Sequence, residues 1–277
     1  MGGGDDRRPV YVAAAGVGAV ALAIGAAALA RRGRSMSAPA LPGAEVALVL
    51  PGDNTPVYTR PGRVLWVSNL AIDADGDPQA YHPDDWGPLR GAPRGLDAPE
   101  NAGEYRNSAT GRTWASWAQV PKWWGVAVGP GGLPVVQSEA DPAPGYWVST
   151  TSLVDPDVRR ATPARYASSR DVPYIAVPPE VLGLGARVGD LALVSVNDRT
   201  AAAIVADVGP RRKIGEGSIA LARLLGLELP ARMARILGVD GRGASRAGGV
   251  RFEVVLKSGS GRLLSAAEIE ERGAAYA

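Results

Sequence analysis

Residues 190–207 read DLALVSVNDRTAAAIVAD and carry the clearest structural signal in the chain. Two apolar runs of strand length flank Asn197-Asp198-Arg199-Thr200, a polar group typical of a hairpin turn. The stretch therefore predicts two neighbouring antiparallel strands.

Further strand signals lie on both sides of this hairpin. They fall at residues 64–72, 123–128, 134–137, 145–154, 173–177 and 250–256. One helix is predicted after Ser218, which is a good N-cap, and it ends at Gly226. A shorter helix is expected at residues 265–273. Because strands dominate without a strand–helix–strand rhythm, we expect a mainly β, barrel-like fold with few helices.

The composition excludes several kinds of chemistry. The 277-residue chain has no Cys, so disulfides, thiol nucleophiles and Cys-ligated metals are excluded. His82 is the single histidine, so a catalytic triad or zinc site built on histidine would have to use it. Carboxylates are left as the main reactive groups.

Charge is distributed unevenly along the chain, although the net charge is only +2. Residues 66–160 hold 12 acidic and 7 basic side chains, and all seven tryptophans fall in this range. An acidic, Trp-rich region favours a cationic or carbohydrate ligand, or marks the core of one domain. The basic residues form no stripe, so we predict no nucleic-acid partner.

The first thirty residues predict a targeting segment. Val10 to Ala30 is uncharged and long enough to cross a bilayer as a helix, and arginines flank both ends. Ala28-Leu29-Ala30 also matches a signal-peptidase site, so anchor and cleaved signal both stay open. Either way we expect an extracytoplasmic protein, membrane-anchored or secreted after cleavage near Ala30.

The motif ADVGPRRKIGEGS at residues 206–218 is the strongest candidate for chemistry. Asp207 ends an apolar strand, and Glu216 lies between two glycines just before the predicted helix. A strand end and a helix start can present two carboxylates to one cleft, as glycoside hydrolysis requires. The alternative is a plain turn, with Glu216 placed favourably at the helix dipole. Arg211-Arg212-Lys213 is either a solvated turn or a source of one cation for Asp207.

Other residues are candidates for ligand binding. Asp73, Asp75 and Asp77 alternate along the chain. Asp73 and Asp75 are candidates to pair with ammonium groups, and the alternative is a plain hairpin turn. We predict no metal, because the glycine spacing of a calcium loop is absent. His82 either contacts substrate or fixes a loop. Aromatic residues that alternate faces on strands are candidates for sugar stacking, among them Trp124 and Tyr146.

The chain resembles glycoside hydrolase family 75, the fungal-type endo-chitosanases. The resemblance runs through DVGP and KIGEGSIALARLLG, and through blocks that appear in the same order upstream. These are residues 71–76, 80–83, 95–97, 101–103, 124–126, 134–137, 141–153, 173–175 and 189–192. Gln137 joins the substrate-binding candidates through one of these blocks. The chain differs from fungal members in having no cysteine, with Ala74 just before Asp75.

The resemblance implies inverting, endo-acting cleavage of β-1,4-linked glucosamine polymer without a cofactor. Glu216 would be the general acid and Asp207 the general base that activates water. It also implies a six-stranded double-psi-like β-barrel, and a cationic amino-sugar polysaccharide as partner. Two alternatives stay open: a hydrolase of peptidoglycan or another cell-surface amino-sugar polymer, and a non-catalytic polysaccharide-binding module.

The expected organisation divides the chain into five parts. Residues 1–8 are a short tail, 9–30 the transmembrane or signal helix, 31–62 a linker with one short strand, 63–257 the chitosanase-like domain, and 258–277 a polar C-terminal tail. The membrane contact is expected through the N-terminal helix alone.

Overall fold

The hairpin predicted at residues 190–207 lies at the centre of the sheet in the computed structural model. β6 (Leu191–Val196) pairs antiparallel with β7 (Arg199–Val208), with Leu191 opposite Ile204. Asn197 has a φ of 54° in the turn, a conformation that Asn adopts more readily than most residues. The predicted hairpin is confirmed.

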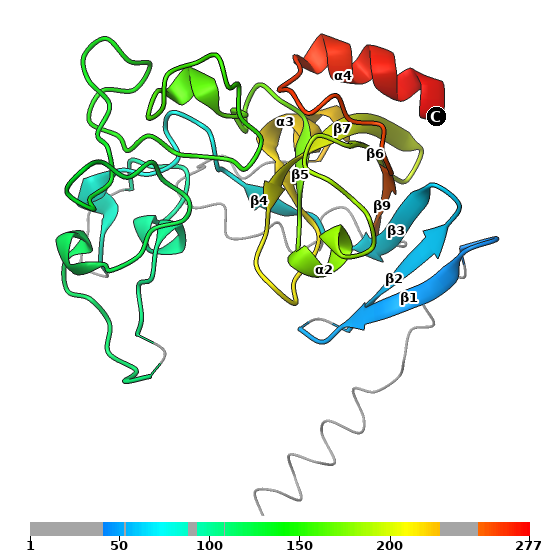
Figure 1. The fold of residues 1–277 in the computed structure, drawn as a ribbon, viewed down its shortest axis with the longest axis horizontal. Coiled ribbons are helices and arrows are strands. Elements are labelled where there is room, and N and C mark those ends of the chain that lie inside the picture. Colours follow the sequence, from blue (N-terminus) through cyan, green and yellow to red (C-terminus); the bar gives the residue numbers. More distant parts are fainter. Residues whose placement is uncertain (1–40, 53, 88–92, 108, 228–248) are drawn as a thin grey trace, which may run out of the picture. The chain divides into compact units, whose positions relative to one another are not determined.

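The structure describes residues 41–277 except 53, 88–92, 108 and 228–248. Within this part a nine-stranded sheet has the order β1-β2-β3-β9-β6-β7-β5-β8-β4 and curls into a half-barrel (Figure 1). The other strands are β1 (Glu45–Leu50), β2 (Thr55–Arg60), β3 (Arg63–Ser68), β4 (Ala71–Asp73), β5 (Tyr174–Val177), β8 (Glu216–Ser218) and β9 (Val250–Val255). The prediction of a mainly β fold is confirmed.

Two parallel pairings interrupt this mostly antiparallel sheet. β5 pairs parallel with β7 on one side and antiparallel with β8 on the other, and β8 pairs parallel with β4. These four strands come from three distant parts of the chain. Their adjacency brings residues near 73, 176, 207 and 216 to one region of the sheet.

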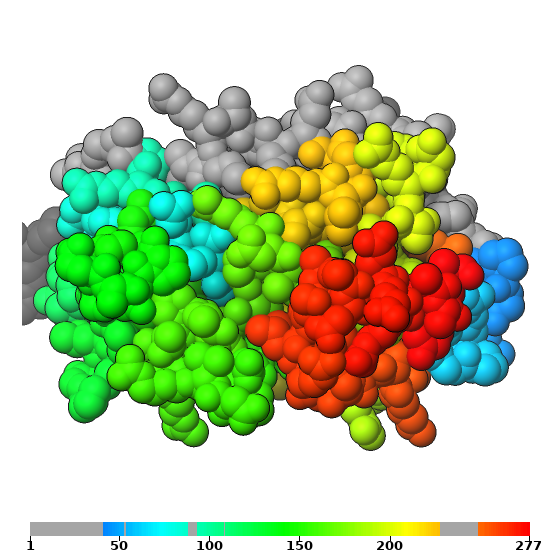
Figure 2. Space-filling view, turned by 90° about the horizontal axis from the view of Figure 1, so that it is seen from above, coloured from blue at the N-terminus to red at the C-terminus, as the bar shows by residue number. Residues whose placement is uncertain are grey.

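The sheet is buried on both faces, because alternate residues of its central strands enter two separate cores. Val205 faces the larger core, which also contains Trp66 and Phe252. These two rings stack with centroids 5.1 Å apart across β3 and β9. Ile204 faces the smaller core, which α4 (Ala266–Gly273) closes with Ile269. Figure 2 shows α4 and the segment before it on the outside of this region, in red and orange.

The regular structure begins earlier in the chain than the expected start of the domain at residue 63. β1 and β2 fall within residues 31–62, where a linker with one short strand was expected; they pair with each other as a hairpin, and β2 also pairs with β3. The proline-flanked segment between them is a turn with Asn54 at a φ of 57°, and Leu50 and Val57 are buried. The helix expected at residues 265–273 is confirmed as α4, whose N-cap Ser265 and Glu268 form a capping box.

The N-terminal prediction lies outside the described residues. Residues 9–30, the expected transmembrane or signal helix, belong to the part of the chain whose structure is not described. In residues 41–277 with the gaps given above, no helix is long and apolar enough to cross a membrane.

Between β4 and β5 the chain makes a long excursion that contains no regular strand in its described residues. The strands expected at 123–128, 134–137 and 145–154 pair only through isolated bridges, such as Val126 with Ser149. Pro134 has no N–H to donate, which interrupts a regular ladder. Trp123 and Trp147 contact edge to face at 5.1 Å inside the excursion, so most of the tryptophan cluster is core.

The described helices are short. α3 (Ile219–Leu224) begins after Ser218, whose hydroxyl accepts a hydrogen bond from the Leu221 N–H at 3.1 Å. The predicted N-cap is therefore confirmed. The others are α2 (Pro179–Leu182) and five 3₁₀ helices: η1 (Pro83–Asp85), η2 (Pro99–Ala102), η3 (Trp117–Gln119), η4 (Pro163–Arg165) and η5 (Ala274–Tyr276).

Candidate active site

An acidic cleft lies where β4, β5, β7 and β8 meet the excursion. Its volume is about 940 Å³. Six carboxyl side chains and a single ammonium group, that of Lys213, are among the described residues that line it. The carboxyls belong to Asp73, Asp75, Asp97, Glu100, Asp207 and Glu216. This excess of negative charge favours a cationic ligand over an anionic one.

Sheet topology brings Asp207 and Glu216 to the two sides of one residue. Asp207 on β7 and Glu216 on β8 are both register partners of Ala176 on β5. Register partners point to the same face of a sheet, and adjacent strands lie about 4.8 Å apart. The two acidic residues therefore share a face, with Cα atoms roughly 10 Å apart by the same spacing. The expectation that both reach one cleft is met.

A local irregularity directs Asp207 into the cleft. The β5–β7 register shifts between Ile175 and Ala176, so that Ala206 is skipped and Asp207 stands opposite Ala176. An unbroken register would place Ala206 there and turn Asp207 to the other face. Such irregularities often re-aim a side chain next to a functional site. Here the alternative position for Asp207 is the buried apolar core that contains Val205 and Val177.

Asp207 is held through one of its two oxygens. Its Oδ1 accepts hydrogen bonds from the Ser152 N–H at 2.9 Å, the Ser152 hydroxyl at 2.6 Å and the Val208 N–H at 2.8 Å. Burial raises the pKa of Asp207 above its usual value, while the hydrogen bonds from Ser152 and Val208 act in the opposite direction. These donors favour the ionised form of a carboxyl that burial would otherwise protonate.

Glu216 has a different environment from Asp207. Within the part of the chain that the structure describes, no donor bonds to its carboxyl. Burial raises the pKa of Glu216; the Lys213 ammonium lowers it, and the charges of Asp207 and Asp97 raise it further. A Cβ placed on Gly209 would lie 2.7 Å from Glu216 Oε2, so the carboxyl occupies space that any other residue at 209 would fill.

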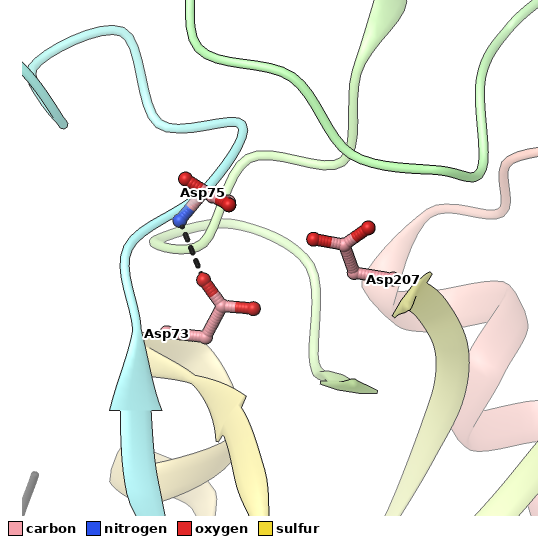
Figure 3. Close-up of side chains that lie close together, drawn as sticks. All are labelled: Asp73, Asp75 and Asp207. Carbon is pink, nitrogen blue, oxygen red and sulfur yellow. Dashed lines mark hydrogen bonds between the residues drawn. The ribbon is translucent and has the colours of Figure 1, made fainter. Parts of the chain in front are cut away.

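Asp73 and Asp75 lie across the cleft from Asp207 (Figure 3). One carboxylate oxygen from each of the three residues lies within 4.8 Å of the others. Asp73 Oδ1 accepts the Asp75 N–H at 2.9 Å, and Asp75 Oδ1 accepts the Tyr81 hydroxyl at 2.6 Å. Burial, and then the neighbouring carboxylates, raise the pKa of both Asp73 and Asp75 well above the usual range.

These three carboxyls are the described residues that could hold a metal ion. Oxygen ligands at this spacing suit a hard divalent cation. They suit the ammonium groups of a cationic ligand equally well, and an acidic cluster alone does not distinguish the two. Asp77, the third member of the D-x-D-x-D pattern, is directed elsewhere and pairs with Arg170 at 3.1 Å.

Trp124 is the one predicted aromatic contact that lines the cleft. Its side chain is 54 % exposed, and its indole N–H donates to the Asn101 carbonyl at 2.7 Å. This bond fixes the ring while leaving a face open, as a sugar-stacking platform requires.

Three other predicted binding residues are outside the cleft lining. His82 is 7 % exposed, accepts the Asp84 N–H on Nδ1 and contacts Tyr146 edge to face at 4.8 Å. The Tyr146 hydroxyl donates to the Arg94 carbonyl at 3.0 Å. The buried Gln137 amide donates to the Pro78 and Trp147 carbonyls. Their contacts hold the excursion together, and local sequence does not distinguish this role from substrate binding.

Several cleft residues were not singled out by the sequence. Tyr81, Asp97 and Ser152 lie in blocks that resemble family 75, yet no pattern assigned them a role. The Lys213 ammonium lowers the pKa of Glu216, a partner that neither alternative for residues 211–213, a solvated turn or a cation for Asp207, had named. Glu100 also lines the cleft. These residues reach the site from the excursion or the β7–β8 connection, and only the three-dimensional structure shows their place there.

No protein-family model matches the chain, and no curated protein is significantly similar to it.

Proposed function

We propose that the protein is an inverting endo-glycoside hydrolase of chitosan, a β-1,4-linked glucosamine polymer. The observation that carries this proposal is the placement of Asp207 and Glu216 on either side of Ala176, facing one acidic cleft. Inverting enzymes hold their two carboxyls about 6.5–9.5 Å apart to admit a water molecule. Two strand spacings, roughly 10 Å between Cα atoms, are compatible with that separation.

Burial raises the pKa of both carboxyls, but their hydrogen bonds differ in a way that supports opposite roles. Asp207 accepts three hydrogen bonds, which favour the ionised form that a base needs. Glu216 lacks such donors among the described residues, and burial raises its pKa, which favours the protonated form that an acid needs. In the proposed reaction Asp207 takes a proton from water as the water oxygen bonds to the anomeric carbon. The glycosidic bond breaks, and its oxygen takes the proton of Glu216.

The rest of the cleft supports a cationic amino-sugar substrate. Glucosamine units carry ammonium groups, and six carboxyls outnumber the single Lys213 in the described lining. The open face of Trp124 is a stacking surface for a sugar ring. Since the attraction is electrostatic at a solvent-facing cleft, KM for chitosan should rise as salt is added.

The resemblance to family 75 supplies two further parts of the proposal. The central strands would form a six-stranded double-psi-like barrel, which the parallel pairs β5–β7 and β4–β8 support. Export, with anchoring by residues 9–30 or release after cleavage near Ala30, would bring the hydrolase to polymers outside the cytoplasm.

The activity is tested by measuring new reducing ends on chitosan, chitin and peptidoglycan with the full chain. We expect release from chitosan, with oligosaccharides as the early products. Release from peptidoglycan alone would replace the substrate while keeping the carboxyl pair. Binding to chitosan without hydrolysis at any pH would replace the enzyme by a binding module.

Gly209→Ala is expected to lower kcat on chitosan about 10- to 100-fold with little loss of stability. The added Cβ would lie 2.7 Å from Glu216 Oε2, and the flexible Glu216 side chain would move away. Steady-state kinetics and thermal unfolding measure the two effects.

Gly131→Ala is the matched control, because a Cβ there meets nothing within 4 Å. It should leave kcat at the wild-type value. Full activity in Gly209→Ala would show that the position of Glu216 is irrelevant to turnover, and would count against Glu216 as the acid.

A further inference from the structure

A five-residue segment, Ser149 to Leu153, connects the two sides of the cleft. At one end the Ser149 hydroxyl lies 3.3 Å from Asp75 Oδ1 and accepts the Gly76 N–H at 3.0 Å. At the other end Ser152 donates to Asp207 Oδ1 through both its N–H and its hydroxyl. The segment therefore contacts one carboxyl in the turn after β4 and one on β7.

The segment is itself fixed by bonds to its surroundings. The Leu153 N–H donates to the Ala206 carbonyl at 2.8 Å, directly beside Asp207. The Thr151 hydroxyl donates to the Leu153 carbonyl at 2.9 Å and accepts the Ala167 N–H at 3.0 Å. Ser152 is thus presented to Asp207 from a backbone that has little freedom to move away.

The bonds to Asp207 are all on one oxygen. With the Val208 N–H, Oδ1 receives three donors, which fill the positions where it could accept another. Among the described residues no donor bonds to Oδ2. A water molecule that Asp207 activates would therefore bond to Oδ2.

We propose that Ser152 is a positioning residue that fixes Asp207 through Oδ1, so that Oδ2 is the oxygen that receives the proton from the attacking water. This inference rests on the proposed function. The groups facing Asp207 are the carboxyls of Asp73, Asp75 and Glu216, all of the same sign. Burial raises the pKa of Asp207, and the Ser152 hydroxyl lowers it, so without that hydroxyl the protonated, inactive form of Asp207 would be favoured.

The test compares Ser152→Ala and Ser152→Thr with the wild type by pH profiles of kcat/KM on chitosan. In Ser152→Ala we expect the acidic limb to move up by about one pH unit and kcat at the optimum to fall about tenfold, because a charge-assisted hydrogen bond is lost. Ser152→Thr, which keeps the hydroxyl, should restore both. An unmoved acidic limb in Ser152→Ala would overturn the inference.

Ser138→Ala is a matched control. Ser138 donates its N–H and hydroxyl to one oxygen of Asp141, at 2.8 and 2.7 Å, in an exposed turn. The variant removes the same kind of bond outside the cleft lining and should leave the profile unchanged. A shift equal to that of Ser152→Ala would also overturn the inference.

A second readout separates this inference from the proposed function. The ¹³C signal of the Asp207 carboxyl, assigned by its loss in Asp207→Asn, can be titrated in wild type and both Ser152 variants. If the wild type does not cleave chitosan, the proposed function fails. The titration alone then tests whether the Ser152 hydroxyl holds the Asp207 carboxyl in its ionised form. A midpoint higher in Ser152→Ala and restored in Ser152→Thr supports the inference; equal midpoints in all three overturn it.

Discussion

Replacing Asp207 by Asn, or Glu216 by Gln, is expected to lower kcat on chitosan by about 10²–10⁴-fold. Each change keeps the size of the side chain and removes its ability to exchange a proton. Asn at 207 can still accept the three hydrogen bonds on Oδ1, so the fold and the Ser152 contact should persist. The loss would then report chemistry and not unfolding.

The two variants should also differ from one another. The wild type is expected to show a bell-shaped pH profile, with Asp207 ionised and Glu216 protonated at the optimum. Asp207→Asn should lose the acidic limb in its residual activity, and Glu216→Gln the basic limb. Steady-state kinetics over pH, with thermal unfolding as the check on folding, measure this difference.

Two positions outside the cleft lining give matched controls. Asp141→Asn alters a partly buried aspartate outside the cleft lining that also accepts two bonds from one serine. Glu270→Gln alters an exposed glutamate on α4. Both should turn over chitosan like the wild type. Wild-type kcat in either cleft variant would remove that residue from the proposed mechanism.

Asp73→Asn is expected to make the protein more stable at pH 7, by about 1–3 kcal/mol. Asp73, Asp75 and Asp207 have carboxylate oxygens within 4.8 Å of one another. Two like charges at this distance repel by roughly 3 kcal/mol at an effective dielectric constant of 20. In the folded protein Asp73 incurs either this repulsion or the cost of keeping a proton that the unfolded chain has lost at pH 7, and Asn at 73 removes both costs. The free energy of unfolding in urea measures the gain.

The sign of the pH dependence follows from the raised pKa values. Burial raises the pKa of Asp73, Asp75, Asp207 and Glu216 in the folded state, so the folded protein binds more protons than the unfolded chain. Their contribution to stability is fully present below the unfolded pKa values of 3.8 and 4.5, and is lost as pH rises through the folded values. Burial lowers the pKa of His82 in the folded state. The contribution of His82 to stability is therefore present above its ordinary pKa of 6.5 and is lost as the pH falls below that value, which is the opposite direction.

Comparing the stability of Asp73→Asn with that of the wild type at two pH values separates the effect of Asp73 from the effects of His82 and the other titratable groups. The stability gain of Asp73→Asn should be larger at pH 7 than at pH 4, where Asp73 is already protonated. Asp157→Asn, at an exposed position, should show no such difference. A variant less stable than the wild type at pH 7 would contradict the account of like-charge repulsion.

Local sequence predicted the parts of the fold that depend on neighbouring residues. The β6–β7 hairpin follows from two apolar runs around Asn197, and the start of α3 follows from Ser218 as an N-cap. Residues 31–62 have the Pro-, Gly- and Ser-rich composition of a linker, within which the sequence predicted only one short strand, and β1 lies there. β2, which contains Pro56, was not predicted, because its strand character depends on pairing with β1 and β3.

The candidate site was predictable only in part, for the same reason. The spacing of Asp207 and Glu216 across a strand end and a helix start indicated a shared cleft. The skipped Ala206, which turns Asp207 into that cleft, has no sequence signature. His82, Gln137 and Tyr146 have the side chains of binding residues, but their hydrogen bonds are internal to the excursion. Ser152 was not predicted, because the sequence around a loop serine does not show which distant residue it will bond; here that residue is Asp207.

The anomeric configuration of the first products tests the central claim most directly. That claim is that Asp207 and Glu216 face one another across a bound water and a glycosidic bond. ¹H NMR of chitosan digested by the full chain, recorded before mutarotation, should show α reducing ends appearing first. Initial β reducing ends would require a nucleophilic carboxylate with no space for that water, and would contradict the account.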